Sequence, residues 1–284
     1  MPGRLAASCL LAYLCSACAT TAPLLRDDPR FAEGQRRLRA TAGRIAGGSE
    51  LAADEALFIQ AEAFYDYRFE LKRTRSPGSY LAQTVAAFTD FAPLTVLAAS
   101  QGLFDLRLRA YDGAAQLFTA LASDHPGSRL RPLALYRLGW ACRSTSQDGF
   151  PCSSRASFGA LGREYAGSRL AARASLAERV PSRSLDRATL WSILPGAGQI
   201  YAGEVWNGTA RLSVGAAFGA LALVPVVGMV RARRFGWIPT ALSLAGVVGL
   251  QVTYTTSYQD AQRAVLDFNE AQEAAFEAAH PELP

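Results

Sequence analysis

The sequence predicts an all-α protein in which helical-hairpin repeats are followed by a transmembrane helical hairpin. Three observations predict this fold class. Two long apolar runs flank a cluster of arginines in the last third of the chain, and a group of residues in the middle recurs 40 positions later. No strand-like alternation of apolar and polar residues persists anywhere. The 284 residues give room for one helical domain and a membrane segment.

The N-terminus has the pattern of a secretory signal over residues 1–19. Arg4 precedes a short apolar run, and small residues follow it. The run is too short to span a bilayer. The segment that ends at Cys18 resembles a bacterial lipoprotein signal, which makes Cys18 the candidate for lipidation. The alternative is ordinary cleavage after Ala19, and both interpretations export the protein.

The soluble domain is expected over residues 24–180 and begins with a series of helical patterns. Glycines at 47–48 and the turn sequence at 75–78 separate the patterns. Apolar residues recur at helical spacing within each segment. The expected helices are Asp27–Arg44, Ala53–Lys72, Tyr80–Phe91 and Leu94–Ala110.

An internal repeat follows, with a constant offset of 40 residues. The segment Phe118–Leu121 recurs as Phe158–Leu161, and Gly127–Leu130 recurs as Gly167–Leu170. Each unit reads as a helix, a short turn and a second helix. Small residues on the facing sides permit the close helix approach that stacked hairpins require. The residues expected in the repeat core are Phe118, Leu121, Tyr136, Phe158 and Leu161.

These hairpins resemble tetratricopeptide-like repeats, and more narrowly those of bacterial envelope proteins, over about residues 80–180. The matching residues are Tyr111, Ala114, Phe118, Leu121, His125, Pro126, Ser128, Ala134, Tyr136, Leu138 and Gly139. The second repeat departs from the pattern at Ala166, where the first has proline. The resemblance implies a concave surface that binds another protein. The alternative is a plain helical bundle.

Two cysteines remain after the signal region, Cys142 and Cys152. The segment between them is polar and rich in turn residues. In an oxidising compartment we expect them to form a disulfide across this loop, worth about 2–3 kcal/mol in the chain-entropy model. The alternative is two unrelated thiols. No second pair of ligands accompanies them, so zinc is not expected.

Residues 191–258 are predicted to form a membrane domain, joined to the repeats by a linker at 181–190. Its two spans, 209–230 and 235–256, each hold about 20 residues, which matches a hydrocarbon layer ~30 Å thick. The short connection carries three arginines that the positive-inside rule keeps in the cytoplasm: Arg231, Arg233 and Arg234. Both flanking regions then lie in the periplasm, and the predicted location is the bacterial inner membrane.

Features within and after the spans predict how they pack. Gly215 and Gly219 form a G-x-x-x-G pattern that we expect to face the second span. The isolated Arg211 is expected to extend its side chain towards the outer surface. Residues 259–284 are expected to form a separate amphipathic helix and tail, which covers the repeats or lies on the membrane.

The sequence just before the first span, LPGAGQIYAG, resembles a PGxGQxYxG signature found before paired spans in a class of small bacterial membrane domains, often joined to such repeats. Its residues here are Pro195, Gly196, Gly198, Gln199, Tyr201 and Gly203. Irregular backbone at membrane depth must be buried in protein or wet. We therefore expect a turn packed on the helical hairpin, with Gln199 bonding backbone groups. The alternative is a binding loop for a lipid or small ligand.

No catalytic residues, metal ligands or cofactor site are predicted, because no motif of that kind occurs. The net charge of +5 comes from scattered arginines, so nucleic acid is not an expected partner. The leading hypothesis is a non-enzymatic periplasmic scaffold, anchored in membrane lipid, that binds another cell-envelope protein. The alternatives are a membrane-embedded subunit in lipid or membrane-protein handling, and an outer-membrane assembly lipoprotein.

Overall fold

The structure is a computed structural model that describes residues 36, 52–73, 93–145, 150–233 and 235–281, with the side chains of 68–73 and 93–106 left aside. The signal, Cys18, Arg234 and most of the helices expected at Asp27–Arg44 and Tyr80–Phe91 lie outside these residues. Every regular element within them is a helix, which confirms the all-α prediction. The chain divides into two compact units, Met1–Thr145 with Gly149–Cys152, and Ser146–Asp148 with Ser153–Pro284.

The first unit contains α3 (Ala53–Arg73), α5 (Pro93–Asp124) and α6 (Arg131–Ala141). The predicted helix Ala53–Lys72 is confirmed as α3, which has two acidic residues in its first turn, where they complement the helix dipole. Its buried Tyr65 contacts the rings of Tyr111 and Phe118 on α5 edge to face. These aromatic contacts hold α3 against α5.

Helix α5 is a single 32-residue helix, longer than the sequence suggests. The helix expected at Leu94–Ala110 and the first helix of the repeat are joined without a break. Gly113, which lies at the junction, has a packing role: a Cβ there would lie 3.0 Å from the ring of Phe64. Because Gly113 has no side chain, the ring of Phe64 on α3 can pack directly against α5 at this point. The glycine serves this contact, and the helix continues through it.

The hairpin of α5 and α6 contains the first repeat. Phe118, Leu121 and Tyr136 are buried in the core of this unit. In the turn, Ser128 Oγ accepts a hydrogen bond from the backbone N–H of Leu130 at 3.0 Å. After α6, Cys142 and Cys152 form a disulfide, with their Cα atoms 5.4 Å apart.

Ser128 also donates a hydrogen bond to Asp54 Oδ2 at 2.6 Å, and this bond holds the pKa of Asp54 below its ordinary value of 3.8. Because the folded-state pKa is lowered, the stabilisation is present above the unfolded pKa and is lost as the pH falls through the folded pKa. Ser128→Ala should therefore raise the pKa of Asp54 and make unfolding less sensitive to acid. An NMR titration of the Asp54 carboxyl carbon measures the shift. Ser168→Ala, the equivalent serine of the second repeat, should leave it unchanged.

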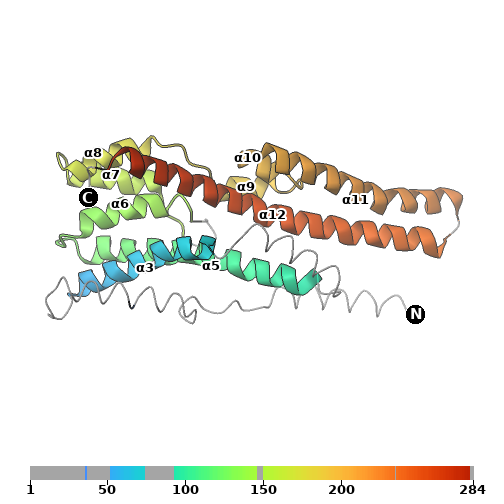
Figure 1. Cartoon of the computed structure of the whole chain (residues 1–284), viewed down its shortest axis with the longest axis horizontal. Helices are drawn as coiled ribbons and strands as arrows, with labels where there is room; N and C mark the ends of the chain where they lie inside the picture. The colour runs from blue at the N-terminus through green and yellow to red at the C-terminus, as the bar shows by residue number, and fades with distance from the viewer. Residues whose placement is uncertain (1–35, 37–51, 74–92, 146–149, 234, 282–284) are drawn as a thin grey trace. The chain divides into compact units, whose positions relative to one another are not determined.

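The second unit contains the remaining six described helices: α7 (Ser154–Glu164), α8 (Arg169–Glu178), α9 (Leu185–Trp191), α10 (Ala197–Tyr201), α11 (Val205–Ala232) and α12 (Trp237–Ala279). Figure 1 shows α11 and α12 side by side along the length of α11. Serine side chains cap the N-termini of α7, α8 and α9. Most of α9 lies within residues 181–190, where the sequence predicts a linker.

The hairpin of α7 and α8 corresponds to the second repeat. Phe158 and Leu161 are buried on α7, as their counterparts Phe118 and Leu121 are on α5. Ser168 Oγ caps α8 by accepting a hydrogen bond from the N–H of Ala171 at 3.1 Å, whereas Ser128 accepts from Leu130 in the turn before α6. The recurring apolar residues thus have the same role inside each hairpin, while the two serines bond differently. The assignment of these hairpins to tetratricopeptide-like repeats stays a prediction, and the 32-residue α5 is much longer than the 11-residue α7.

Helix α12 runs for 43 residues without interruption. The second apolar run and the amphipathic helix expected from residue 259 are parts of this one helix. Residues 252–262 contain neither glycine nor proline, so nothing in the sequence ends the helix there. After residue 259, where a new helix is expected, Ala261, Val265 and Leu266 are fully buried in the second unit. The change from an apolar to an amphipathic pattern marks a change of surroundings, with no break in the backbone.

Candidate membrane-anchoring domain

Helices α11 and α12 are long and apolar enough to cross a membrane. Only 17% and 11% of their most apolar segments are buried, whereas the core helix of a soluble protein would be mostly buried. Large aliphatic side chains lie on their outer surfaces, among them Leu223, Val224, Leu244, Val247 and Val248. An apolar surface of this extent is typical of a helix pair surrounded by lipid.

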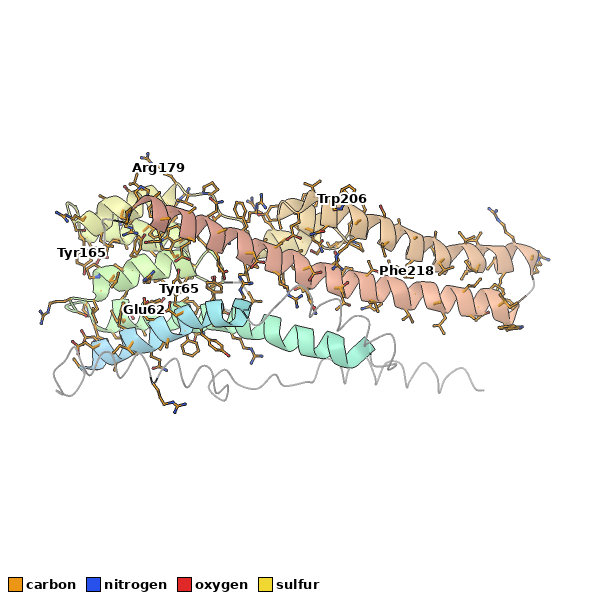
Figure 2. All side chains as sticks on the ribbon, in the orientation of Figure 1. Glu62, Tyr65, Tyr165, Arg179, Trp206 and Phe218 are labelled. Atoms are coloured by element: carbon orange, nitrogen blue, oxygen red, sulfur yellow. A yellow bond between two sulfur atoms is a disulfide. The ribbon has the colours of Figure 1, made fainter. Side chains whose placement is uncertain are left out.

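The two helices meet through small residues, of which Gly249 on α12 is expected from the sequence and Ala222 and Gly246 are not. A Cβ on Gly246 would lie 2.7 Å from the Cα of Ala222, so the backbones are in close contact there. Ser243 Oγ donates to the carbonyl oxygen of Ala222 at 2.6 Å. Phe218 lies between the helices over Gly249 (Figure 2). Gly219 has nothing within 4 Å of its Cβ position, so the expected G-x-x-x-G contact is wrong.

Gly215, the other half of that pattern, has a different neighbour. A Cβ on Gly215 would lie 3.2 Å from the side chain of Pro195 and 3.8 Å from Thr253 on α12. This glycine therefore mainly gives room to the proline that opens the PGAGQ turn. Small residues at this level of α11 serve the packing of the turn, while those nearer the tip serve the packing of the two helices.

The tip of the hairpin combines cations and aromatic rings. Arg231 lies in the last turn of α11, and Arg233 ends the helix in the left-handed conformation with φ 48°. Phe235 and Trp237 follow, and their side chains are 84% and 80% exposed. Aromatic rings next to arginines are the pattern found where a span meets the headgroups.

The PGAGQ turn is packed against the end of the second apolar run. Gly196 donates its N–H to Ser257 Oγ at 2.6 Å. Gln199, which is fully buried, donates from Nε2 to the carbonyl oxygen of Ser257 at 2.9 Å and accepts a bond from Ser257 Oγ at 3.0 Å. Both ends of the Gln199 amide are therefore bonded to one residue of α12. We call this arrangement the Gln199–Ser257 clamp.

The glycines of the motif allow backbone to approach backbone at the clamp. Gly196 adopts φ 94°, and a Cβ there would overlap the carbonyl oxygen of Gly208 on α11 and lie 2.9 Å from the N atom of Leu212. A Cβ on Gly198 would lie 2.6 Å from that of Ala261 on α12. Each position excludes a side chain for a stated geometric reason.

The last residues of the motif tie it to the segment before α9. Tyr201 Oη accepts a hydrogen bond from the N–H of Ser184 at 3.1 Å. Gly203 adopts φ 87°, and the guanidinium of Arg183 lies against it. That guanidinium also stacks 3.9 Å from the ring centre of Phe268 on α12. The motif thus joins four helices, α9 to α12, into one unit.

Arg211 bonds residues at and beyond the predicted outer end of the second span, which agrees with the outward direction expected from the sequence. Its guanidinium bonds Thr256 Oγ1 at 2.7 Å and forms an ion pair with Asp260, both on α12. Asp260 also pairs with Arg263 at 3.0 Å. The nearest acid in space lies 49 residues along the chain, so sequence patterns could not reveal the partner.

Replacing Asp260 with alanine should lower the free energy of unfolding by about 1–3 kcal/mol, because the half-buried Arg211 and the buried Arg263 would lose their shared acceptor. Thermal unfolding of the detergent-solubilised protein measures the loss. Glu178→Ala is the matched control, since Glu178 pairs with the largely exposed Arg155 and should change stability by ~0–1 kcal/mol. Equal losses in the two variants would show that Asp260 has no special role.

Comparison with protein-family models, curated proteins and solved structures gives no match. Within the described residues, no group of three or more His, Cys, Asp or Glu side chains could hold a metal ion. The strongest constellation in the second unit is the clamp, whose polar groups bond to each other. Ser257 is the member that the sequence analysis missed, because one serine in a polar stretch carries no signal of its own.

Proposed function

We propose that this protein is a non-enzymatic, membrane-anchored scaffold of the bacterial inner membrane. Its repeat hairpins and C-terminus would lie in the periplasm and bind another cell-envelope protein. One observation carries the proposal: a single helix, α12, is apolar and exposed in its first half and buried against the other helices of the second unit in its last third. Such a helix joins an anchor directly to a folded domain.

The length of α12 supports this division. At 1.5 Å per residue, 43 residues extend for about 65 Å, of which a bilayer core occupies about 30 Å. The remaining length of α12 packs against the part of the second unit that lies outside the bilayer. Asn269 bonds both the N–H and the carbonyl oxygen of Arg183, and Glu277 pairs with the buried Arg173 of α8. A scaffold built in this way would keep its second repeat close to the membrane.

Charge and cysteine chemistry support the proposed orientation. Arg231 and Arg233 at the tip favour a cytoplasmic tip, and a hairpin returns both of its flanks to the opposite side. The disulfide between Cys142 and Cys152 then lies in the compartment where disulfides persist. A reporter fused at Arg233 tests the orientation: it should be active as a cytoplasmic fusion, and activity as a periplasmic fusion would contradict the proposal.

The binding function is tested by photo-crosslinking in cells with the full chain. Crosslinkers at exposed positions of the repeat hairpin, Arg163 and Leu176, should capture a discrete envelope protein. Crosslinkers at Leu223 and Val247 on the spans should capture little. The reverse pattern would support the alternative of a membrane-embedded subunit. Recovery of the protein in outer-membrane fractions would support an assembly lipoprotein instead.

The structure of the PGAGQ turn helps to distinguish a scaffold that binds through its repeats from a membrane-embedded subunit that acts through the turn. A loop that binds lipid or a small ligand would offer polar groups to it, whereas the amide of Gln199 is bonded at both ends within the chain. The positions beside Gly196 and Gly198 are filled by α11 and α12. This favours an architectural role for the motif and supports our proposal that the repeats carry the binding function.

A further inference from the structure

We infer that the segment before the first span forms a membrane-docking ledge that inserts into the outer leaflet at the boundary of headgroups and acyl chains. The ledge consists of Leu190, Trp191, Ile193, Leu194 and Trp206. This inference deepens the proposed function and rests on it, because the ledge needs a bilayer around α11 and α12. Its partner is the lipid surface itself.

The side chains of the ledge are unusually exposed. Leu190, Trp191, Ile193 and Leu194 are 55–64% exposed, although they are large, apolar and nearly consecutive. Trp206, at the start of α11, is 85% exposed (Figure 2). Scattered exposed apolar residues are ordinary, but a contiguous group of this size marks an interaction site.

Hydrogen bonds hold the ledge in a fixed orientation. Ser192, between the exposed residues, is fully buried and donates to the carbonyl oxygen of Ala188 at 2.7 Å. Thr189 accepts a hydrogen bond from Gln262 of α12 at 2.7 Å. The polar residues of this segment therefore face the protein, and the apolar ones are turned outwards by bonds that the structure shows.

The ledge lies at the level along the hairpin where a bilayer interface is expected. The clamp places the PGAGQ turn beside Ser257. Trp237, at the opposite end, lies 20 residues earlier in the same helix, since 257 − 237 = 20. Twenty residues of helix extend for about 30 Å, the thickness of a hydrocarbon core. The ledge and the aromatic tip are thus spaced as the two interfacial belts of one bilayer are.

Two observations favour lipid over a protein as the partner of the ledge: this spacing, and the apolar character that the ledge shares with the start of the first span. Val205 and Trp206, the first two residues of α11, are both exposed and apolar, so the first span itself begins with the same kind of surface. The ledge would give the protein a third contact with the outer leaflet, beside the two spans. Because tilting the helix pair would pull this contact out of the leaflet or push it deeper, the ledge would oppose the tilt. This would fix the height and direction of the part of α12 that carries the second repeat.

The test measures the depth of single fluorescent labels in the full chain. Cys9, Cys15 and Cys18 are replaced by serine, and the disulfide protects the remaining two cysteines from labelling. Ile193→Cys reports the ledge, Asp186→Cys at the start of α9 is the aqueous control, and Val247→Cys is the control within the span. Each variant is labelled with an environment-sensitive dye and reconstituted in vesicles of phosphatidylethanolamine and phosphatidylglycerol.

The ledge predicts that iodide quenches the label at 193 about threefold less than the label at 186, because a probe ~5–10 Å deep is shielded from aqueous anions. A spin-labelled lipid with its nitroxide near the headgroup should quench it. Iodide quenching equal at 193 and 186 would overturn the ledge and leave the anchor intact. Protection at 193 without quenching by the lipid would show a protein cover, which also overturns it. Quenching of 247 by iodide would refute the anchor itself.

Discussion

Replacing Gly196 with alanine should lower the free energy of unfolding by about 3 kcal/mol or more, which is the larger of the two main predicted effects. Two costs combine. The residue adopts φ 94°, a conformation that costs an L-residue about 1–3 kcal/mol. The new Cβ would also overlap the backbone of Gly208, which cannot move aside as a side chain could, and overpacking adds roughly 1–3 kcal/mol.

Gly167→Ala separates these two costs. Gly167, in the turn between α7 and α8, has nearly the same φ of 85°, but nothing lies within 4 Å of its Cβ position. It should therefore cost only the backbone strain, about 1–2 kcal/mol. Thermal unfolding in detergent compares the two variants. If Gly196→Ala cost no more than Gly167→Ala, the close contact between the PGAGQ turn and α11 would be refuted.

The Gly196 variant also distinguishes an architectural motif from a binding loop. The clamp joins the turn to Ser257, so a displaced turn should loosen α9 and α10 from α12 and expose the buried Gln199. Limited proteolysis should then cut between α9 and α11. A binding loop would instead lose function with its fold intact, and proteolysis would be unchanged.

The all-helical content and the two helices that are apolar enough to cross a membrane could be predicted from the sequence, because both features depend on local composition. Exposed helices of about 20 apolar residues need no partner to be recognised, and the helix pattern of α3 is clear from its own residues. The recurring Phe118 and Phe158 also have equivalent buried positions, each within its own hairpin. Periodicity predicts which face of a helix is buried, whatever buries it.

Boundaries were harder to predict because they depend on what a helix contacts. The pattern changes near residue 258, and this change predicts a separate element from residue 259. In the structure α12 continues, and threonines at 253 and 256 bond back to carbonyl oxygens of the same helix. A helix ends where a breaker or a cap ends it, so a change of pattern alone is a weak boundary signal.

The partners of distant contacts were the hardest to predict: the sequence predicts that Gln199 bonds the backbone of the hairpin, but it does not name Ser257. Small residues occur on several faces of α11, and sequence alone does not say which face meets α12. The pattern of Gly215 and Gly219 was chosen because it fits a known spacing, whereas the structure uses Ala222 with Gly246. The ion pair between Arg211 and Asp260 was missed for the same reason.

The pairing of α11 and α12 leads to the second large prediction, a test of register with two matched glycines. Gly246→Leu should destabilise the hairpin by about 1–3 kcal/mol or more, because its Cβ would lie 2.7 Å from the Cα of Ala222 and the helices would have to separate. Gly219→Leu should be neutral or slightly stabilising, since its Cβ position is open and leucine favours the helix by up to about 1 kcal/mol.

The measurement is the thermal unfolding of both variants in the same detergent, together with a spin-label distance between α11 and α12. Only Gly246→Leu should lower the unfolding temperature and lengthen the distance, because only Gly246 lies between the helices. The opposite ranking would mean that the helices pair through Gly215 and Gly219 after all. The apolar faces assigned to lipid would then be turned inwards, so this comparison tests the anchor as well as its packing.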